Sequence, residues 1–285
     1  MRLVRAELLK IRRRQATWVM LILSLFLLVV LFLLGSVTFQ LAGIIEFPEA
    51  YNGISQFAFG LGGLLAVVYA ASFVGSDWNW GVVRNVVARG ESRSKYLLAK
   101  AAALAIAFAI ATVILYLVGI VLAFVAGWLF GLPVESPLRG RGLQDLADNL
   151  ILGYPVLLER AALGFAVAVV LRSQLAGAVV GIVFFLGESV VKFTLLGATL
   201  FQRAGNVIGG DGIELSGPEW YQYLPVSVGD YVVAAAPGGS GGLTNIIEQF
   251  LIRPVPLDLA LIAVAIYLVL AMGVAIIAFD RQEIV

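Results

Sequence analysis

The chain has 285 residues, of which 61% are apolar and only 13% are charged, and its mean hydropathy is +1.00. Soluble domains are close to half apolar and a quarter charged, so this composition excludes an ordinary soluble protein. The sequence holds no cysteine and no histidine, which excludes disulfides, thiolate or imidazole metal sites and histidine general bases. We therefore expect no metal site, no catalytic residues and no enzyme acting by itself.

Six apolar segments are long enough to cross a bilayer as helices, which takes roughly 18 or more apolar residues. They predict an all-α polytopic membrane protein with a single transmembrane domain over residues 1–285. The first run is too long for a cleaved secretory signal, so we expect it to remain as a span. The expected spans are residues 17–39, 52–75, 97–130, 150–171, 175–200 and 256–279.

Lysine and arginine are distributed unevenly between the two sides of this topology. Thirteen of the nineteen basic residues fall in segments on the side of the N-terminus, whereas most acidic residues, Asp230 among them, fall on the other side. Basic residues accumulate in cytoplasmic loops. Both termini are therefore expected to be cytoplasmic.

The N-terminal segment, residues 1–15, has the pattern of a basic amphipathic helix. Such helices lie in the membrane interface, with their cations near anionic lipid headgroups. The alternative is that these residues only set the topology. The basic residues are Arg2, Arg5, Lys10, Arg12, Arg13 and Arg14.

The second inner segment, residues 76–96, is longer than a simple turn. Asp77 is placed to cap a short helix and Gly90 to end it. Between them, Trp80, Val83 and Val87 form an apolar stripe at helical spacing. This helix can lie along the membrane with its tryptophans as anchors, or it can dock on a cytoplasmic protein.

The same segment resembles the loop of ABC-2-type transporter permeases, although Val82 stands where many members have threonine. The resemblance implies a coupling helix that docks on two copies of a cytoplasmic ABC ATPase subunit. It rests on Asp77, Trp78, Trp80, Gly81, Arg84, Arg89, Gly90, Ser92, Arg93 and Lys100.

ATP and magnesium would be bound by that partner, because the chain contains no Gly-Lys pair and hence no Walker A motif. The resemblance also implies a second permease subunit, as homodimer or heterodimer, and a bacterial or archaeal cytoplasmic membrane.

Four charged residues lie inside the expected fourth and fifth spans, namely Glu159, Arg160, Glu188 and Lys192. These spans are joined by a four-residue turn, so they form an antiparallel hairpin in which Arg160 and Glu188 have matching depth. Isolated charges are costly there, which predicts that Arg160 pairs with Glu188. The four can line a polar path or a dimer interface, or they can form a static ion-pair network.

The outer segment, residues 201–255, is rich in glycine and precedes the last span. Residues 223–236 are apolar enough to dip back into the membrane, and the resemblance implies short re-entrant helices here.

The sequence thus favours the transmembrane subunit of an ATP-driven exporter that moves an amphiphilic, lipid-like, drug or peptide substrate. Its partners would be the ATPase, a second permease subunit and membrane lipids, with no nucleic acid. Two alternatives remain open: an ion-coupled secondary transporter or channel that uses the intramembrane carboxylates, and a non-transporting membrane anchor for a cytoplasmic protein.

Overall fold

The computed structural model describes residues 2–38, 47, 49–88, 92–131, 136–137, 140–209, 219–237 and 255–282. Every regular element in these ranges is a helix, and six are long and apolar enough to span a membrane. The prediction of an all-α polytopic membrane protein is therefore confirmed. The candidate spans are Gln15–Leu33, Glu49–Asn79, Arg93–Phe130, Gly142–Leu171, Gln174–Thr199 and Leu257–Arg281.

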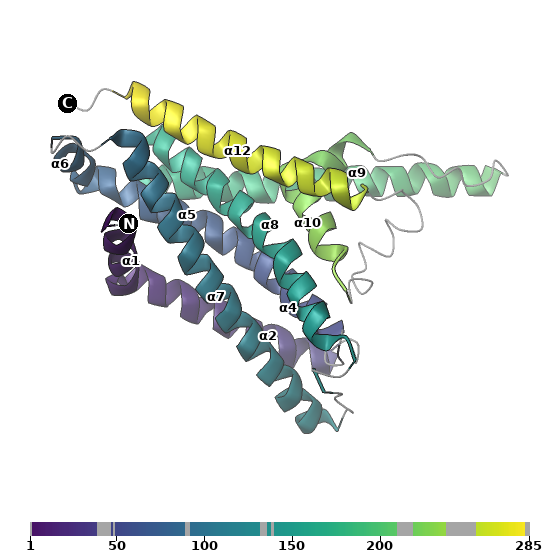
Figure 1. Ribbon diagram of the computed structural model, residues 1–285. Helices are drawn as coiled ribbons and strands as arrows, with labels where there is room; N and C mark the ends of the chain where they lie inside the picture. The colour runs from purple at the N-terminus through teal and green to yellow at the C-terminus, as the bar shows by residue number, and fades with distance from the viewer. Residues whose placement is uncertain are drawn as a thin grey trace.

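Figure 1 shows the helices in the order in which they follow along the chain. In order they are α1 (Arg2–Arg13), α2 (Gln15–Thr38), α4 (Glu49–Ser55), the π-helix η1 (Gln56–Leu61), α5 (Gly62–Asn79), α6 (Val82–Ala88), α7 (Arg93–Phe130), α8 (Gly142–Leu171), α9 (Gln174–Gly209), the 3₁₀-helix η2 (Trp220–Tyr223), α10 (Pro225–Ala234) and α12 (Leu257–Arg281).

Helices α5 and α8 form the centre of the bundle. Most of the residues in these two spans are buried, whereas most of those in the spans of α2, α9 and α12 are not. The central pair packs with unusually close backbones, because a Cβ on Gly164 would lie 2.3 Å from the carbonyl oxygen of Val67. Glycine is required at this position for steric reasons.

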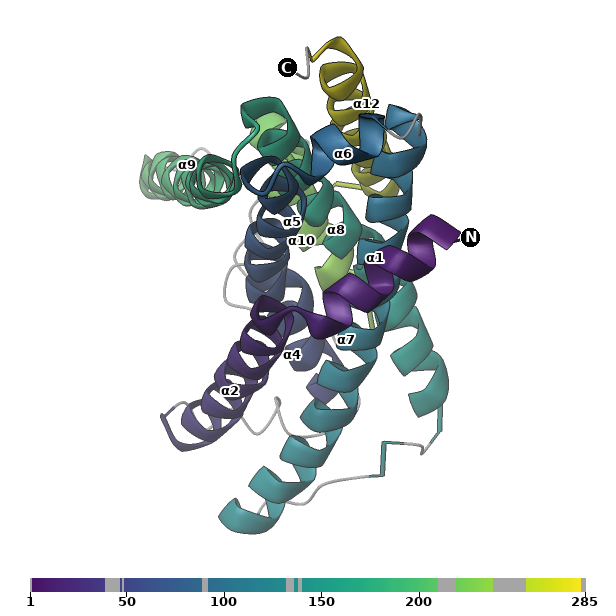
Figure 2. The same ribbon diagram turned by 90° about the vertical axis from the view of Figure 1, so that its left-hand side faces the viewer.

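Both ends of the described chain lie at the same end of the bundle, which we call the basic end (Figure 1). Here α1 packs against α7 (Figure 2). The Nη1 of Arg93, at the start of α7, donates to the carbonyl oxygens of Phe279, Asp280 and Gln282 at the end of α12. This common end agrees with an even number of spans.

The N-terminal amphipathic helix forms as predicted, and its apolar face is engaged by the protein. Ile11 belongs to the buried core, and Val4 and Leu8 pack against that core. The helix therefore lies on the bundle rather than presenting its whole apolar face to lipid.

Helices α8 and α9 form the predicted hairpin, joined by Arg172 and Ser173. The outer segment begins later than predicted, since α9 continues to Gly209. Beyond it, α10 packs against α8, α9 and α12, as expected of a segment that turns back toward the bundle. Most of the glycine-rich residues on either side of α10 lie outside the described ranges.

Candidate functional site

A buried group of charges at the basic end joins α1, α5 and α7. Lys100 is fully buried, and its Nζ lies 2.6 Å from Oδ2 of Asp77 and 3.2 Å from Oε2 of Glu7. The same ammonium group donates to the carbonyl of Phe73 and lies 3.9 Å from the centroid of the Phe73 ring. A lysine can be buried in this way only with such partners, because an unpaired buried charge is very costly.

Lys10 and Tyr96 complete this group of charges. We call it the lysine cluster, and its members are Glu7, Lys10, Asp77, Tyr96 and Lys100. The Nζ of Lys10 lies 2.9 Å from Oδ1 of Asp77 and 3.6 Å from Oε1 of Glu7, and the hydroxyl of Tyr96 donates to Oδ2 of Asp77. Two carboxylates and two ammonium groups make the cluster neutral as a set. It fastens the end of the central helix α5 to α1 and α7.

Asp77 does not cap a helix, and that expectation is wrong. It lies in the last turn of α5, which continues to Asn79, because the helix is held there by the lysine cluster. Asp77 and Lys100 are too deeply buried to touch a soluble partner directly. Trp78 is also turned inward, with its ring 5.6 Å from that of Phe279.

The exposed part of the predicted coupling loop begins at Asn79 and includes Trp80, which is 76% exposed. Gly81 makes the turn into α6 with φ of +66°, a left-handed conformation that favours glycine. Arg84 on α6 is exposed, whereas Val83 is buried in the core. Trp80 and Val83 therefore do not form one continuous stripe.

The rest of the loop is only partly described. Ser92 stands at the N-cap position of α7, and Arg93 holds the end of α12. Arg89, Gly90 and the side chain of Val87 lie outside the described residues.

The basic residues of α1 separate into two groups. Lys10 belongs to the lysine cluster, and Arg14 donates to the hydroxyls of Ser72 and Ser76 on α5. The other described side chains are exposed, those of Arg5, Arg12 and Arg13, while that of Arg2 is not described.

A second group of charges surrounds Arg160, the largest of the fully buried side chains. Its Nη2 lies 2.7 Å from Oδ1 of Asp230 and 3.0 Å from the carbonyl oxygen of Val226, both in α10. Its Nη1 donates to the carbonyl oxygens of Phe59 and Gly60 in η1. One guanidinium group thus binds three elements of the bundle together.

The position of the Arg160 side chain depends on two glycines and on the π-helix. A Cβ on Gly63 would lie 2.6 Å from Cδ of Arg160, and one on Gly229 would lie 3.1 Å from its Nη2. The two carbonyls that Arg160 binds belong to η1, and π-helical turns occur frequently at functional sites. The local geometry of α5 and α10 is therefore fitted to this side chain.

The predicted pair of Arg160 with Glu188 is wrong, because α10 supplies the partner instead. Oε1 of Glu188 accepts a hydrogen bond of 2.7 Å from the backbone N–H of Ser227 at the start of α10. Lys192 lies 3.6 Å from Oδ2 of Asp230. The topology prediction places Asp230 among the outer acidic residues. The apolar residues around Asp230 indicate re-entry, and this signal could have identified Asp230 as a residue of the site.

We call Glu159, Arg160, Glu188, Lys192 and Asp230 the arginine cluster. Glu159 differs from the other members in its hydrogen bonding. Its side chain is fully buried, and neither carboxyl oxygen has a hydrogen-bond partner in the described part of the chain. A polar cavity of about 200 Å³ adjoins the cluster and is lined by Gln56, Gly60, Ser189, Lys192, Ser227 and Asp230, among others.

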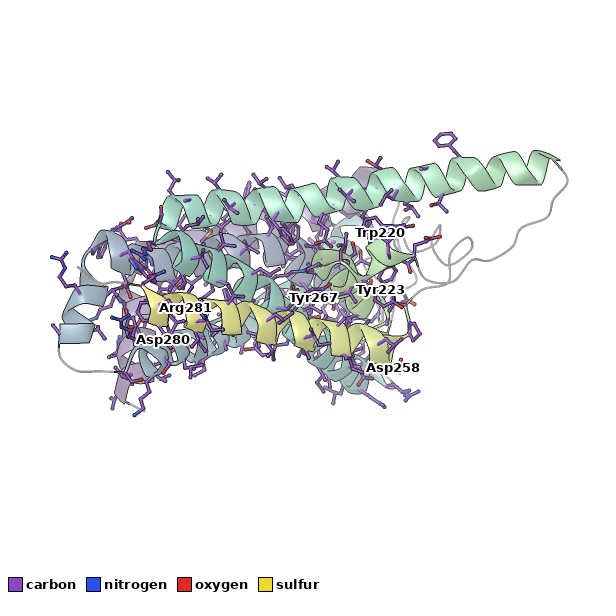
Figure 3. The ribbon with its side chains drawn as sticks, turned by 90° about the horizontal axis from the view of Figure 1, so that it is seen from above. Trp220, Tyr223, Asp258, Tyr267, Asp280 and Arg281 are labelled. Carbon is purple, nitrogen blue, oxygen red and sulfur yellow. The ribbon has the colours of Figure 1, made fainter. Side chains whose placement is uncertain are left out.

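Helix α12 packs against α8 and α10, the helices that carry Arg160 and Asp230. Asp280 and Arg281 lie at its basic end and Asp258 at the other, with Tyr267 between them (Figure 3). The hydroxyl of Tyr267 donates to the carbonyl of Tyr223 in η2 at 2.8 Å, which ties the entry of α10 to this span.

The fold and the two buried clusters define an all-α polytopic membrane protein in which the short helix α10 supplies a countercharge to a buried arginine. The chain belongs to the family described as "Protein of unknown function (DUF2705)", whose model matches residues 18–285. The match begins in α2, so it includes all of the arginine cluster and leaves out α1. A comparison with curated proteins gives no match.

Proposed function

We propose that this chain is the transmembrane subunit of an ATP-driven exporter of the ABC-2 type, with its basic end facing the cytoplasm. The observation that carries the proposal is the contrast between two neighbouring parts of one loop. Asp77 is fixed inside the bundle by Lys100, whereas Trp80, three residues later, is 76% exposed. An exposed knob on a firmly held base is suited to receive a soluble partner.

The base of this knob leads directly into the centre of the protein. Trp80 follows α5, the central helix that packs against α8 and is continuous with η1. A displacement of α6 by a partner would therefore act on α5 and, through the carbonyls of Phe59 and Gly60, on Arg160. A partner shifts such an equilibrium only by binding one conformation more tightly than the other.

The proposed partners are two copies of a cytoplasmic ATPase, which bind ATP and magnesium, and a second permease subunit, identical or related. The proposed substrate is amphiphilic, lipid-like, a drug or a peptide. Largely apolar spans at the periphery and a polar cavity beside the arginine cluster suit a molecule with both characters.

The test reconstitutes the permease in nanodiscs with a cytoplasmic Walker A ATPase from the same genome, and measures complex formation and ATP hydrolysis. Trp80→Ala and Arg84→Glu are expected to abolish the complex. Arg172→Glu reverses a charge at another exposed turn of the basic end and serves as the control. Undiminished complex formation in both loop variants would contradict the coupling role.

A second candidate function, ion-coupled transport, is favoured by Glu159 alone. A buried carboxyl group in a membrane span is a default candidate for a proton or ion site. In this case Glu159→Gln would abolish uptake or efflux driven by an ion gradient in proteoliposomes without ATP. Transport that requires ATP and survives Glu159→Gln would exclude this candidate.

A further inference from the structure

A groove of about 460 Å³ lies between α1, α2, α5 and α7, and no member of either charge cluster lines it. Its volume falls within the roughly 300–1,000 Å³ of small-molecule sites. Buried residues of α5, such as Ala66 and Tyr69, form its floor. Its rim carries exposed apolar side chains, namely Trp18 on α2 and Ile106 and Ile110 on α7. The groove therefore opens sideways, where the bilayer surrounds the spans.

The groove has a polar end and a long apolar part. Arg12 of α1 lines it at the basic end, and its side chain is exposed. Along α7 the lining runs from Ile106 to Leu115, about 13 Å at 1.5 Å per residue. One cation at the entrance of an apolar channel matches a molecule with an anionic head and a hydrocarbon chain.

One polar group inside the groove remains unused by the protein. Thr112 is 3% exposed, and its hydroxyl has no hydrogen-bond partner in the described part of the chain. Other hydroxyls on spanning helices, such as those of Ser24 and Thr194, donate to the carbonyl four residues earlier. Thr112 lies six residues, about 9 Å along the helix, beyond Ile106. It can donate to an ester carbonyl below a headgroup that is held at the entrance.

We propose that this groove binds one anionic glycerophospholipid, with its phosphate at Arg12, an ester carbonyl at Thr112 and its acyl chains along α2 and α7. Lipid tails are as apolar as the groove wall, so burial of apolar surface alone would not hold a lipid in the groove in preference to the surrounding bilayer. Retention and selectivity come from the charge-assisted contact of the guanidinium with phosphate. The inference goes beyond the proposed function, because it involves neither an ATPase nor transport.

The test titrates the purified full-length protein in detergent with phosphatidylglycerol or phosphatidylcholine of identical acyl chains, and counts retained lipids by native mass spectrometry. The wild type is expected to retain one phosphatidylglycerol at least tenfold more tightly than phosphatidylcholine. Arg12→Gln removes this preference, and Arg13→Gln, an exposed neighbour that does not line the groove, keeps it. Thr112→Val weakens both lipids roughly fivefold, as expected for one hydrogen bond.

Filling the groove gives an independent result. Ala111→Trp, on the groove wall, lowers retention of both lipids at least tenfold, whereas Leu117→Trp, exposed on the same helix and outside the groove, leaves it unchanged. Leu21→Trp fills the opposite wall and replaces Ala111→Trp if that variant does not fold. Equal retention of the two lipids by the wild type, or no effect of filling, would overturn the proposal. So would a lipid-free dimer that Ala111→Trp converts to monomers, since the occupant would then be a second copy.

Discussion

The guanidinium of Arg160 in α8 and the carboxylate of Asp230 in α10 lie 2.7 Å apart, although 70 positions separate them in the chain. Arg160 is fully buried, whereas the side chain of Asp230 is 42% exposed toward the adjoining cavity. The pair therefore joins the interior of the bundle to a polar space at its side. Any movement of α10 must act on a charge that also holds η1.

Replacing Arg160 by methionine is expected to reduce the free energy of unfolding by about 1–3 kcal/mol for each buried acceptor that loses its donor. The substitution leaves the buried carbonyls of Phe59 and Val226 without their donor, whereas Asp230, whose side chain is 42% exposed, keeps Lys192 at 3.6 Å. Reversible unfolding in mixed micelles measures the change. Arg172→Met, at an exposed turn, should cost less than about 0.5 kcal/mol. Equal costs for the two variants would contradict the central role of Arg160.

Gly63→Ala is expected to be destabilising by about 1–3 kcal/mol, because the added Cβ would lie 2.6 Å from Cδ of Arg160. Gly273→Ala in α12 is the matched control, since a Cβ there meets no atom within 4 Å of the described structure. That change should be neutral, or stabilising by up to about 1 kcal/mol, as alanine favours a helix interior. Thermal unfolding in detergent, followed by tryptophan fluorescence, ranks the two. The opposite order would show that Arg160 does not occupy this path.

Lys100→Met is expected to reduce the free energy of unfolding by about 3–5 kcal/mol, because it leaves the carboxylates of Glu7 and Asp77 buried with too little positive charge. Adding Asp77→Asn should recover part of this loss, so that the double variant is less destabilised than the sum of the single ones. Unfolding in mixed micelles supplies the four values of the cycle. Lys95→Met, exposed five residues earlier on α7, is the control. If the free-energy changes of the two single variants simply added up in the double variant, the coupling between Lys100 and Asp77 would be contradicted.

The proposed orientation can be tested directly, because the chain contains no cysteine. Arg172→Cys reports on the basic end of the bundle and Asp258→Cys on the opposite end, and both positions are exposed. A membrane-impermeant maleimide is expected to label Asp258→Cys in intact cells. Arg172→Cys should be labelled only after the cells are permeabilised. The reverse pattern would place the basic end, and with it α6, on the wrong side for a cytoplasmic partner.

The six spans were predictable from the sequence, because a spanning helix satisfies its backbone hydrogen bonds internally and so depends on local composition. The N-terminal helix and the hairpin of α8 and α9 were predictable for the same reason, from a periodic pattern and a short turn. The positions of the charged residues also indicated that Arg160 needs an opposite charge within the bundle.

The tertiary structure determines which charged residues pair with one another. Arg160 and Glu188 match in depth along one hairpin, but depth does not specify the face of a helix or the segment that packs against it. Asp230 reaches Arg160 because α10 turns back into the bundle, and Lys100 reaches Glu7 across 93 positions because α1 folds against α7. Burying a charge requires a partner, and composition shows that need. The identity of the partner depends on packing between distant segments, which local sequence does not encode.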